Sequence, residues 1–240
     1  MSERSTATLC LVHGAWHGAW CWQKLLAELT ARGVPAVTFD LPGHGDSAEP
    51  LGGVAADAAA TRRAAAAVDG PVVLVGHSSG GVVINEAAIG LTNVVHLVYL
   101  CAFMLDVGES MATLAAPEER SADMAAAVRV AGDGTSRLDP DLAASVLYGG
   151  CAREDVAAAL RRLGPQLLAM RTTPASAAPW RSLPSTYVVS AQDKAISPRL
   201  QRRLAQRATH AVELDTGHAP FLSMPGAVAD ILERAARLAA

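Results

Sequence analysis

The segment that decides the fold is Val72-Val73-Leu74-Val75-Gly76-His77-Ser78-Ser79-Gly80-Gly81. Four apolar residues of strand-forming type precede the pattern Gly-x-Ser-x-Gly, and residues of helical character follow it. This strand–turn–helix arrangement places the serine on a turn so sharp that its backbone is strained, and glycines two positions to either side avoid a clash. The segment therefore predicts Ser78 as a nucleophile above the edge of a sheet, at the positive end of the following helix.

The same pattern also occurs by chance as a plain structural turn in glycine-rich chains. Its position between a strand and a helix is what favours the catalytic interpretation. Ser79 is the alternative nucleophile by residue type, but residue 77 is a histidine and only Gly81 stands at one of its two-residue offsets. We therefore favour Ser78.

Short apolar runs alternate with helical segments on both sides of this turn. Strands are expected at 8–12, 34–39, 72–75, 94–100, 186–190 and 211–214, and helices at about 20–31, 54–68, 79–91, 198–206 and 225–238. Gly33 should end the first helix, because glycine tolerates left-handed dihedrals. Continuous apolar strands separated by helices predict a doubly wound, mostly parallel sheet of about six strands, with ligands at the carboxyl ends of the strands.

Residues 105–185 interrupt this alternation. They contain helical pieces at 117–130, 139–147 and 154–163, joined by Gly- and Pro-containing turns, but no good strand. We expect a helical cap, inserted into a single domain that spans residues 1–240 and lying over the strand ends. A long surface excursion is the alternative, although structureless loops of that length are uncommon.

Length and composition agree with one large α/β domain. The chain has 240 residues, of which 51% are hydrophobic and 18% charged, and its formal net charge is -3. This balance disfavours disorder and nucleic-acid binding. No apolar run approaches the roughly 20 residues of a membrane span, and the polar stretch from Met1 to Thr8 lacks a signal peptide, so we expect a cytoplasmic protein.

The four cysteines share no spacing typical of a metal site. Cys10 and Cys101 lie within apolar runs, which indicates buried, inert thiols. Cys21 and Cys151 complete the set. No motif predicts a metal site.

The candidate base for Ser78 is His218, in Asp215-Thr216-Gly217-His218-Ala219-Pro220 just after the last strand. That position puts it at the carboxyl edge of the sheet, where Ser78 is expected; a surface histidine is the alternative. Three histidines follow earlier strands at the same edge and could line the pocket: His13, His17 and His44. The others are expected in a strand, at the opposite edge or beneath the nucleophile turn: His96, His210 and His77.

The imidazole needs a carboxylate to fix its tautomer. Asp193 follows the strand at 186–190, and the order Ser78, Asp193, His218 is the one used by hydrolases of this type of turn. Two rivals remain, Asp106 after an earlier strand and Asp215 three residues before the histidine. Asp193 could instead be a turn residue paired with Lys194.

Acyl transfer also needs N–H donors for the developing oxyanion. The backbone N–H of Ser79 at the helix start is one candidate. The backbone N–H of Ala15, in the turn His13-Gly14-Ala15-Trp16 after the first strand, is the other. A plain tight turn is the alternative interpretation of that stretch.

Together these residues resemble a known family. The stretches Leu11-Val12-His13-Gly14-Ala15-Trp16-His17-Gly18-Ala19-Trp20, Gly76-His77-Ser78-Ser79-Gly80-Gly81, Asp193-Lys194 and Thr216-Gly217-His218-Ala219-Pro220-Phe221 are similar to the α/β-hydrolases of the plant methylesterase and hydroxynitrile lyase group. The resemblance is weak across 105–185. It implies the triad of Ser78, Asp193 and His218, the oxyanion donors Ala15 and Ser79, no cofactor, and often a homodimer.

Two departures bear on the reaction. Hydroxynitrile lyases of this group carry a lysine where this chain has Ala219, and a threonine where it has Gly14. Without them the esterase arrangement remains. The turn Pro42-Gly43-His44-Gly45 is closer to bacterial esterases than to the plant enzymes.

The sequence therefore predicts a serine hydrolase that cleaves small carboxylic esters through an acyl-enzyme. The alternatives are a cofactor-free C–C lyase of the hydroxynitrile lyase type and a non-catalytic small-molecule receptor. The expected partner is the ester, not nucleic acid or membrane. Candidate substrate-binding residues, whose apolar members are more often core residues, are His13, Gly14, Trp16, Met104, Leu105, Met124, Leu147, Tyr148, Met170 and Trp180.

Overall fold

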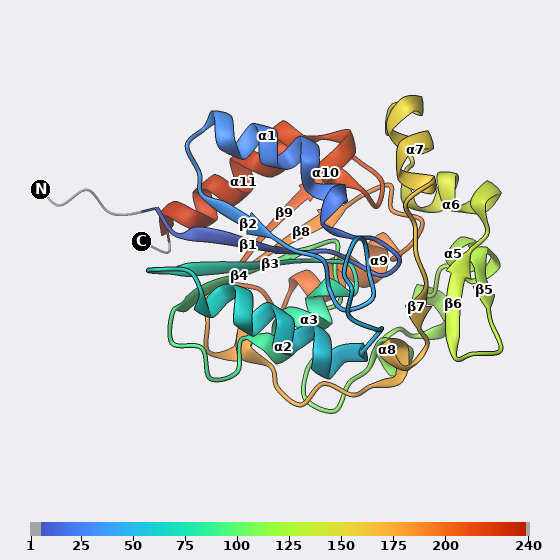
Figure 1. Ribbon diagram of the computed structural model, residues 1–240, viewed down its shortest axis with the longest axis horizontal. Coiled ribbons are helices and arrows are strands. Elements are labelled where there is room, and N and C mark those ends of the chain that lie inside the picture. Colours follow the sequence, from blue (N-terminus) through green and yellow to red (C-terminus); the bar gives the residue numbers. More distant parts are fainter. Residues whose placement is uncertain (1–5, 239–240) are drawn as a thin grey trace, which may run out of the picture.

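The computed structural model describes residues 6–238 and is built around a six-stranded sheet (Figure 1). The strand order is β2-β1-β3-β4-β8-β9, and every neighbouring pair is parallel. The strands are β1 (Thr8–Val12), β2 (Ala36–Thr38), β3 (Val72–His77), β4 (Val94–Leu100), β8 (Ser185–Ser190) and β9 (His210–Leu214). The prediction of a doubly wound sheet is confirmed, although β2 is shorter than the expected strand at 34–39.

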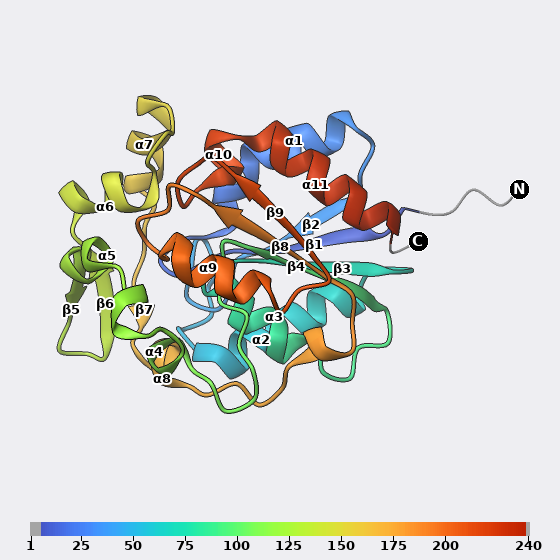
Figure 2. The same cartoon turned by 180° about the vertical axis from the view of Figure 1, so that it is seen from behind.

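Helices cover both faces of the sheet (Figures 1 and 2). The 3-10 helix η1 (Ala19–Trp22), α1 (Gln23–Ala31), α10 (Pro220–Ser223) and α11 (Pro225–Leu238) lie on one face, and α2 (Gly53–Ala66), α3 (Gly80–Ala87) and α9 (Pro198–Ala205) on the other. Each face has its own apolar cluster, since the side chains of successive strand residues alternate between faces. All six positions of β3 are buried. Gly33, with φ +68°, ends α1 as expected.

Residues 105–185, which we call the inserted segment, connect the adjacent strands β4 and β8. Figure 1 shows most of its elements beyond the carboxyl ends of the sheet strands. They are α4 (Met111–Leu114), η2 (Pro117–Glu119), α5 (Ala122–Ala127), β5 (Val128–Val130), β6 (Thr135–Leu138), α6 (Pro140–Leu147), α7 (Arg153–Leu160), β7 (Gln166–Leu167), α8 (Ala169–Thr172) and η3 (Pro179–Arg181).

The expectation that this segment contains no strand was wrong. Its strands β5, β6 and β7 form a small antiparallel sheet, and the helix expected at 117–130 divides into η2, α5 and β5. The turn between β5 and β6 explains the difference. Gly134 has φ +81°, and the Asp133 carboxylate accepts hydrogen bonds from the Thr135 N–H at 3.0 Å and the Thr135 hydroxyl at 2.7 Å. Such a turn favours a hairpin over a continuing helix.

Among the helices of residues 6–238, none combines the length and apolar character needed to cross a membrane. Cys10, Cys21 and Cys101 are buried free thiols, and Cys151 is partly buried. Burial raises the pKa of Cys10 to about 12, in keeping with an inert thiol. Residues 1–5, part of the polar start on which the expectation of a missing signal peptide rests, lie outside the described residues.

One carboxylate is buried in an unusual position. Asp57, on α2, is only 1% exposed, and neither of its carboxylate oxygens has a hydrogen-bond partner within residues 6–238. Burial raises its pKa to about 7 because the charged form loses its hydration. Asp57 therefore affects the stability of the folded protein and is not part of the candidate active site.

Candidate active site

Ser78 stands on the turn between β3 and α3 with a strained backbone, at φ +55°. Gly76 and Gly80, which flank Ser78, are required because backbone atoms of other residues approach them too closely for a side chain. A Cβ on Gly76 would lie 2.6 Å from the Gly80 carbonyl oxygen, and a Cβ on Gly80 would lie 2.6 Å from the Val12 carbonyl oxygen. These are distances that real side chains do not adopt. The turn therefore has the geometry that the Gly-x-Ser-x-Gly pattern predicts, with Ser78 buried to 9% exposure.

His218 lies in the loop between β9 and α10 and is 2% exposed. Its Nδ1 is 2.7 Å from Asp193 Oδ2, the direction in which an N–H donates to the carboxylate. With the proton on Nδ1, Nε2 of the neutral ring keeps its lone pair. The backbone carbonyl of His218 is also held, because it accepts a hydrogen bond from His77 Nε2 at 2.8 Å and one from Cys101 Sγ at 3.4 Å. His77 thus lies beneath the nucleophile turn, as expected, and positions the His218 loop.

Four donors surround the Asp193 carboxylate. Oδ1 accepts from the backbone N–H groups of Ala195 at 2.7 Å and Ile196 at 3.0 Å. Oδ2 accepts from the Gln201 side-chain amide at 2.7 Å, in addition to His218. The Asp193 side chain is 0% exposed, so its orientation is fixed by the protein rather than by water.

The two rival carboxylates are engaged elsewhere. Asp106 forms an ion pair with Arg181, which lowers the pKa of the Asp106 carboxyl. Asp215 accepts a hydrogen bond of 2.8 Å from the side chain of Gln192. Asp193 is therefore the carboxylate that meets His218. Its neighbour Lys194 is exposed and makes no ion pair with it.

Two backbone N–H groups near Ser78 are unengaged. Among the described residues, neither Ala15 N–H nor Ser79 N–H donates a hydrogen bond to a protein acceptor. The turn that carries Ala15 approaches the nucleophile closely. A Cβ on Gly14 would lie 2.9 Å from both Ser78 Cβ and His77 Nδ1. Glycine at position 14 is therefore what lets this turn reach Ser78.

The turn 13–17 is tied to the inserted segment by several hydrogen bonds. His17 Nδ1 donates to the Ala15 carbonyl at 2.8 Å, and the Tyr148 hydroxyl donates to His17 Nε2 at 2.8 Å. Burial lowers the pKa of His17 to about 4, so the ring is neutral at pH 7 and can donate and accept at once. The Trp16 carbonyl accepts from Gly164 N–H at 2.8 Å, and Trp16 itself has φ +63°.

The other histidines of this edge also hold the backbone. His13 Nδ1 donates to the Gly14 carbonyl at 2.9 Å, and its Nε2 accepts from Leu41 N–H at 3.1 Å. His44 Nδ1 donates to the Pro42 carbonyl at 3.0 Å, and its Nε2 is 3.0 Å from the Gln166 side-chain amide. His13 and His44 are both buried, and their hydrogen bonds hold the loops at the carboxyl edge of the sheet. His96 is buried in β4 against Thr186, and His210 is exposed at the start of β9.

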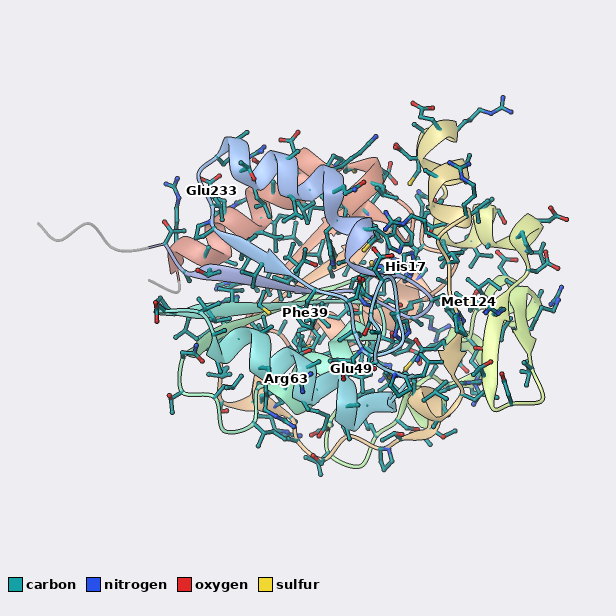
Figure 3. All side chains as sticks on the ribbon, in the orientation of Figure 1. His17, Phe39, Glu49, Arg63, Met124 and Glu233 are labelled. Carbon is teal, nitrogen blue, oxygen red and sulfur yellow. The ribbon has the colours of Figure 1, made fainter. Side chains whose placement is uncertain are left out.

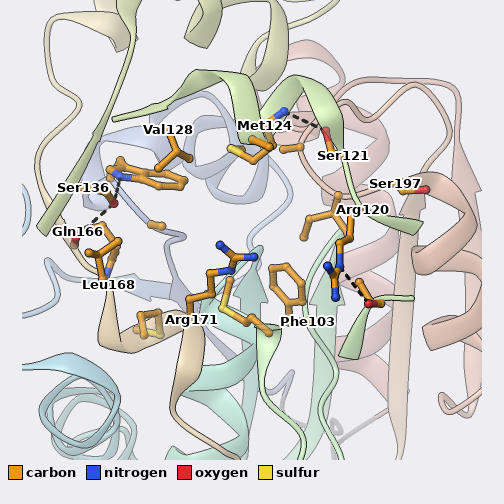
Figure 4. Close-up of a pocket in the computed structure, with 18 of the residues that line it drawn as sticks. Phe103, Arg120, Ser121, Met124, Val128, Ser136, Gln166, Leu168, Arg171 and Ser197 are labelled. Atoms are coloured by element: carbon orange, nitrogen blue, oxygen red, sulfur yellow. Dashed lines mark hydrogen bonds between the residues drawn. The ribbon is translucent and has the colours of Figure 1, made fainter. Parts of the chain in front are cut away.

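A cavity of about 410 Å³ lies between the sheet edge and the inserted segment (Figure 4). Ser78 and His218 are not among the residues that line it, but two residues close to the nucleophile turn are. Ala15 lines it, as does Phe103, whose N–H donates to the Ser78 carbonyl at 3.1 Å. Its remaining wall includes Met111, Glu119, Arg120, Ser121, Met124, Val128, Val130, Ser136, Gln166, Leu167, Leu168, Met170, Arg171, Ala195, Ile196, Ser197 and Leu200.

Three of the ten predicted substrate-binding residues line this cavity: Trp16, Met124 and Met170. Figure 3 shows Met124 on the inserted segment, beyond His17 at the sheet edge. Six others are packed or bonded inside the protein and do not line it: His13, Gly14, Met104, Leu105, Leu147 and Tyr148. Trp180 is half-buried and donates from Nε1 to the Leu105 carbonyl at 2.8 Å.

Sequence reasoning missed the polar part of the wall, above all Arg120 and Arg171. A cation within an otherwise apolar stretch, such as Arg171 directly after Met170, was the available signal. It is a weak one, because most exposed arginines only face water.

Three buried side chains have ligand-type atoms within 4.8 Å of one another: His77, Cys101 and His218. His77 Nε2 and Cys101 Sγ donate to the His218 carbonyl and His218 Nδ1 bonds Asp193, while His77 Nδ1 has no partner among the described residues. Burial also raises the pKa of Cys101, which disfavours the thiolate that metals bind. The arrangement fits positioning of His218 better than ion binding.

Comparison with known proteins gives consistent matches. Residues 11–231 match the model of the alpha/beta hydrolase family. The chain is 33% identical to the alpha/beta hydrolase nvfD of Aspergillus novofumigatus, over 95% of this chain and 96% of that protein. It is 28% identical to a pheophorbidase of Raphanus sativus, over 98% and 95%. A pyrethroid hydrolase from Sphingobium faniae has the same fold, with a TM-score of 0.87 at 22% identity over 97% and 98% of the two chains.

Proposed function

The chain belongs to the alpha/beta hydrolase family, and from that premise we propose that it hydrolyses small carboxylic esters through an acyl-enzyme. One observation carries the proposal. The strained Ser78 follows β3, and the buried His218–Asp193 pair, joined at 2.7 Å, follows β9 and β8, so that all three stand at the carboxyl edge of the same sheet. A nucleophile, a base and an orienting carboxylate at one edge are the parts that acyl transfer needs.

In the proposed reaction Ser78 Oγ attacks the ester carbonyl while His218 Nε2 takes the hydroxyl proton. The N–H groups of Ala15 and Ser79, which have no acceptor within residues 6–238, donate to the oxyanion that forms. Collapse of the tetrahedral intermediate expels the alcohol, which receives the proton from His218. Water, activated by His218, then attacks the acyl-enzyme and releases the acid. Asp193 stabilises the imidazolium at both steps.

The arrangement gives less support to a hydroxynitrile lyase. A leaving cyanide needs a cation or strong donor in a dry pocket, and Ala219 offers only a methyl group at the position next to the base. A threonine in place of Gly14 would meet Ser78 and His77 at 2.9 Å. Lys194, the nearest lysine in sequence, is exposed and does not line the cavity. A non-catalytic receptor would need the pocket, but it would not need four hydrogen-bond donors around the Asp193 carboxylate.

A fluorophosphonate probe and p-nitrophenyl acetate test the proposal. The wild-type protein should be labelled covalently and should release p-nitrophenol. Ser78→Ala should lose labelling and lower turnover roughly a thousandfold or more. Ser79→Ala is the matched comparison, since alanine keeps the backbone N–H, and it should still be labelled.

Labelling that survives in Ser78→Ala would contradict the assignment of the nucleophile. Mandelonitrile provides the test between reaction classes. Cyanide release should be at least about a hundredfold slower than ester hydrolysis, because loss of a stabiliser of the leaving charge costs ~3 kcal/mol or more. Cyanide release at rates equal to ester hydrolysis would favour the lyase.

A further inference from the structure

The cavity next to the proposed oxyanion turn is apolar along most of its wall but carries two cations. Apolar side chains such as Phe103, Met124 and Met170 line it, together with the guanidinium groups of Arg120 and Arg171. Figure 4 shows Arg171 reaching from α8 into the middle of the cavity, with Arg120 on the opposite wall. Both residues are exposed, so these groups stand where the cavity meets solvent.

Neither guanidinium has a carboxylate partner. Within residues 6–238, Arg120 makes a single weak hydrogen bond from Nε to the Ala115 carbonyl at 3.4 Å, and Arg171 donates none from its side chain. Two arginines close to the same part of the molecule do have carboxylate partners. Arg203 pairs with Glu119 at 2.8 and 2.7 Å, and Arg181 pairs with Asp106.

The negative charge on the cavity wall does not offset these cations. Glu119 is the sole carboxylate among the lining residues of the described chain. Arg203 holds it with two hydrogen bonds and lowers its pKa to about 2. The cavity thus presents an excess of positive charge to whatever fills it.

An occupant of this cavity covers the side of the Arg171 guanidinium that faces the cavity, and there it must replace water as the hydrogen-bond acceptor. A purely apolar occupant cannot, and leaving a charged donor without an acceptor is costly. A carboxylate matches the guanidinium best, because its two oxygens accept the two parallel N–H groups. We propose that the ester bound here carries a carboxylate at the end remote from the scissile bond, and that Arg171, assisted by Arg120, binds it. This inference rests on the proposed ester hydrolysis.

A matched pair of esters tests it: p-nitrophenyl hexanoate, and the mono-p-nitrophenyl ester of adipic acid, in which a carboxylate replaces the terminal methyl group. After subtraction of spontaneous hydrolysis, we expect kcat/KM to be about tenfold higher for the adipate ester. The ratio of the two values should fall to about one in Arg171→Gln, fall less in Arg120→Gln, and be partly kept in Arg171→Lys. It should also fall as the salt concentration rises from 50 to 500 mM, because salt screens exposed charges.

Arg234→Gln is the charge-matched control, since Arg234 is an exposed arginine of α11 that does not line the cavity. It should keep the wild-type ratio. A wild-type ratio of one or less, or an equal ratio in Arg171→Gln and wild type, would overturn the inference while ester hydrolysis stands.

A binding measurement separates the two proposals. In Ser78→Ala, calorimetry with monomethyl adipate and methyl hexanoate reports recognition without turnover. Tighter binding of the adipate, lost in Ser78→Ala/Arg171→Gln, supports the carboxylate site even if wild-type protein hydrolyses neither ester. Equal or weaker binding of the adipate overturns it.

Discussion

The carboxyl edge of the sheet and the inserted segment are built by different means. At the sheet edge, backbone groups fix the functional side chains: Ser78 by a strained turn, Asp193 by two N–H groups, and His218 through its own carbonyl. In the inserted segment, short helices and a three-stranded sheet present exposed side chains such as Arg120 and Arg171 to the cavity. The comparison suggests that main-chain geometry sets the reaction, while replaceable side chains set the substrate.

The strongest test compares one carboxylate from each region. Asp193→Asn should lower kcat for p-nitrophenyl acetate by about a thousandfold, because the amide favours the wrong tautomer of His218. Asp106→Asn, at the start of the inserted segment, should change kcat less than twofold, since Asp106 pairs with Arg181. Steady-state kinetics of the two variants measure kcat, and circular dichroism checks that both variants are folded. A large loss in Asp106→Asn with little loss in Asp193→Asn would reverse the assignment of the acid.

A smaller effect is expected where the two regions meet. Tyr148→Phe removes the hydroxyl that donates to His17, which in turn holds the Ala15 carbonyl. We expect kcat to fall about tenfold with little change in KM, because a loosened oxyanion turn affects the transition state more than binding. Ser145→Ala, an exposed position on the helix α6 that ends just before Tyr148, is the control. An unchanged kcat in Tyr148→Phe would mean that the oxyanion turn keeps its geometry without the hydrogen bond from Tyr148.

The last effect concerns the stability of the sheet-forming part and leaves kcat unchanged. The raised pKa of Asp57, about 7, means that the folded protein binds a proton more tightly than the unfolded chain does. Stability should therefore be highest below about pH 4 for this group, and this contribution is lost as the pH rises to about 7. Asp57→Asn removes the charge but keeps a buried amide, so we expect a gain in stability of up to about 4 kcal/mol at pH 8, at about 1.4 kcal/mol per pKa unit, and none at pH 4.

Urea unfolding at the two pH values measures this difference, with Asp69→Asn, an exposed turn residue, as the control. A pH-independent difference between Asp57→Asn and wild type would show that Asp57 is not a buried, unpaired acid.

The sheet was predictable because its signals are local. Apolar runs and glycines at fixed offsets gave β4 at 94–100 and α11 at 225–238 with the bounds that the structure has. The pairing of His218 with Asp193 followed from strand ends that must share one edge. Within the inserted segment the same reasoning failed, since β5–β7 are only two to four residues long and pair through a turn. Arg120 and Arg171 escaped notice because their role depends on a cavity that no local pattern encodes.

The hydrogen bonds that join turn 13–17 to the inserted segment have a consequence for protein engineering. Tyr148 donates to His17 and Gly164 N–H donates to the Trp16 carbonyl, while Ser136 accepts from Trp16 Nε1 at 3.3 Å. A chimaera that exchanged residues 105–185 for the equivalent segment of a relative would remove all three hydrogen bonds together with much of the cavity wall. Such a chimaera would gain a new specificity but lose rate unless these hydrogen bonds were restored. Tyr148, Gly164 and Ser136 should therefore be kept when the rest of the inserted segment is exchanged.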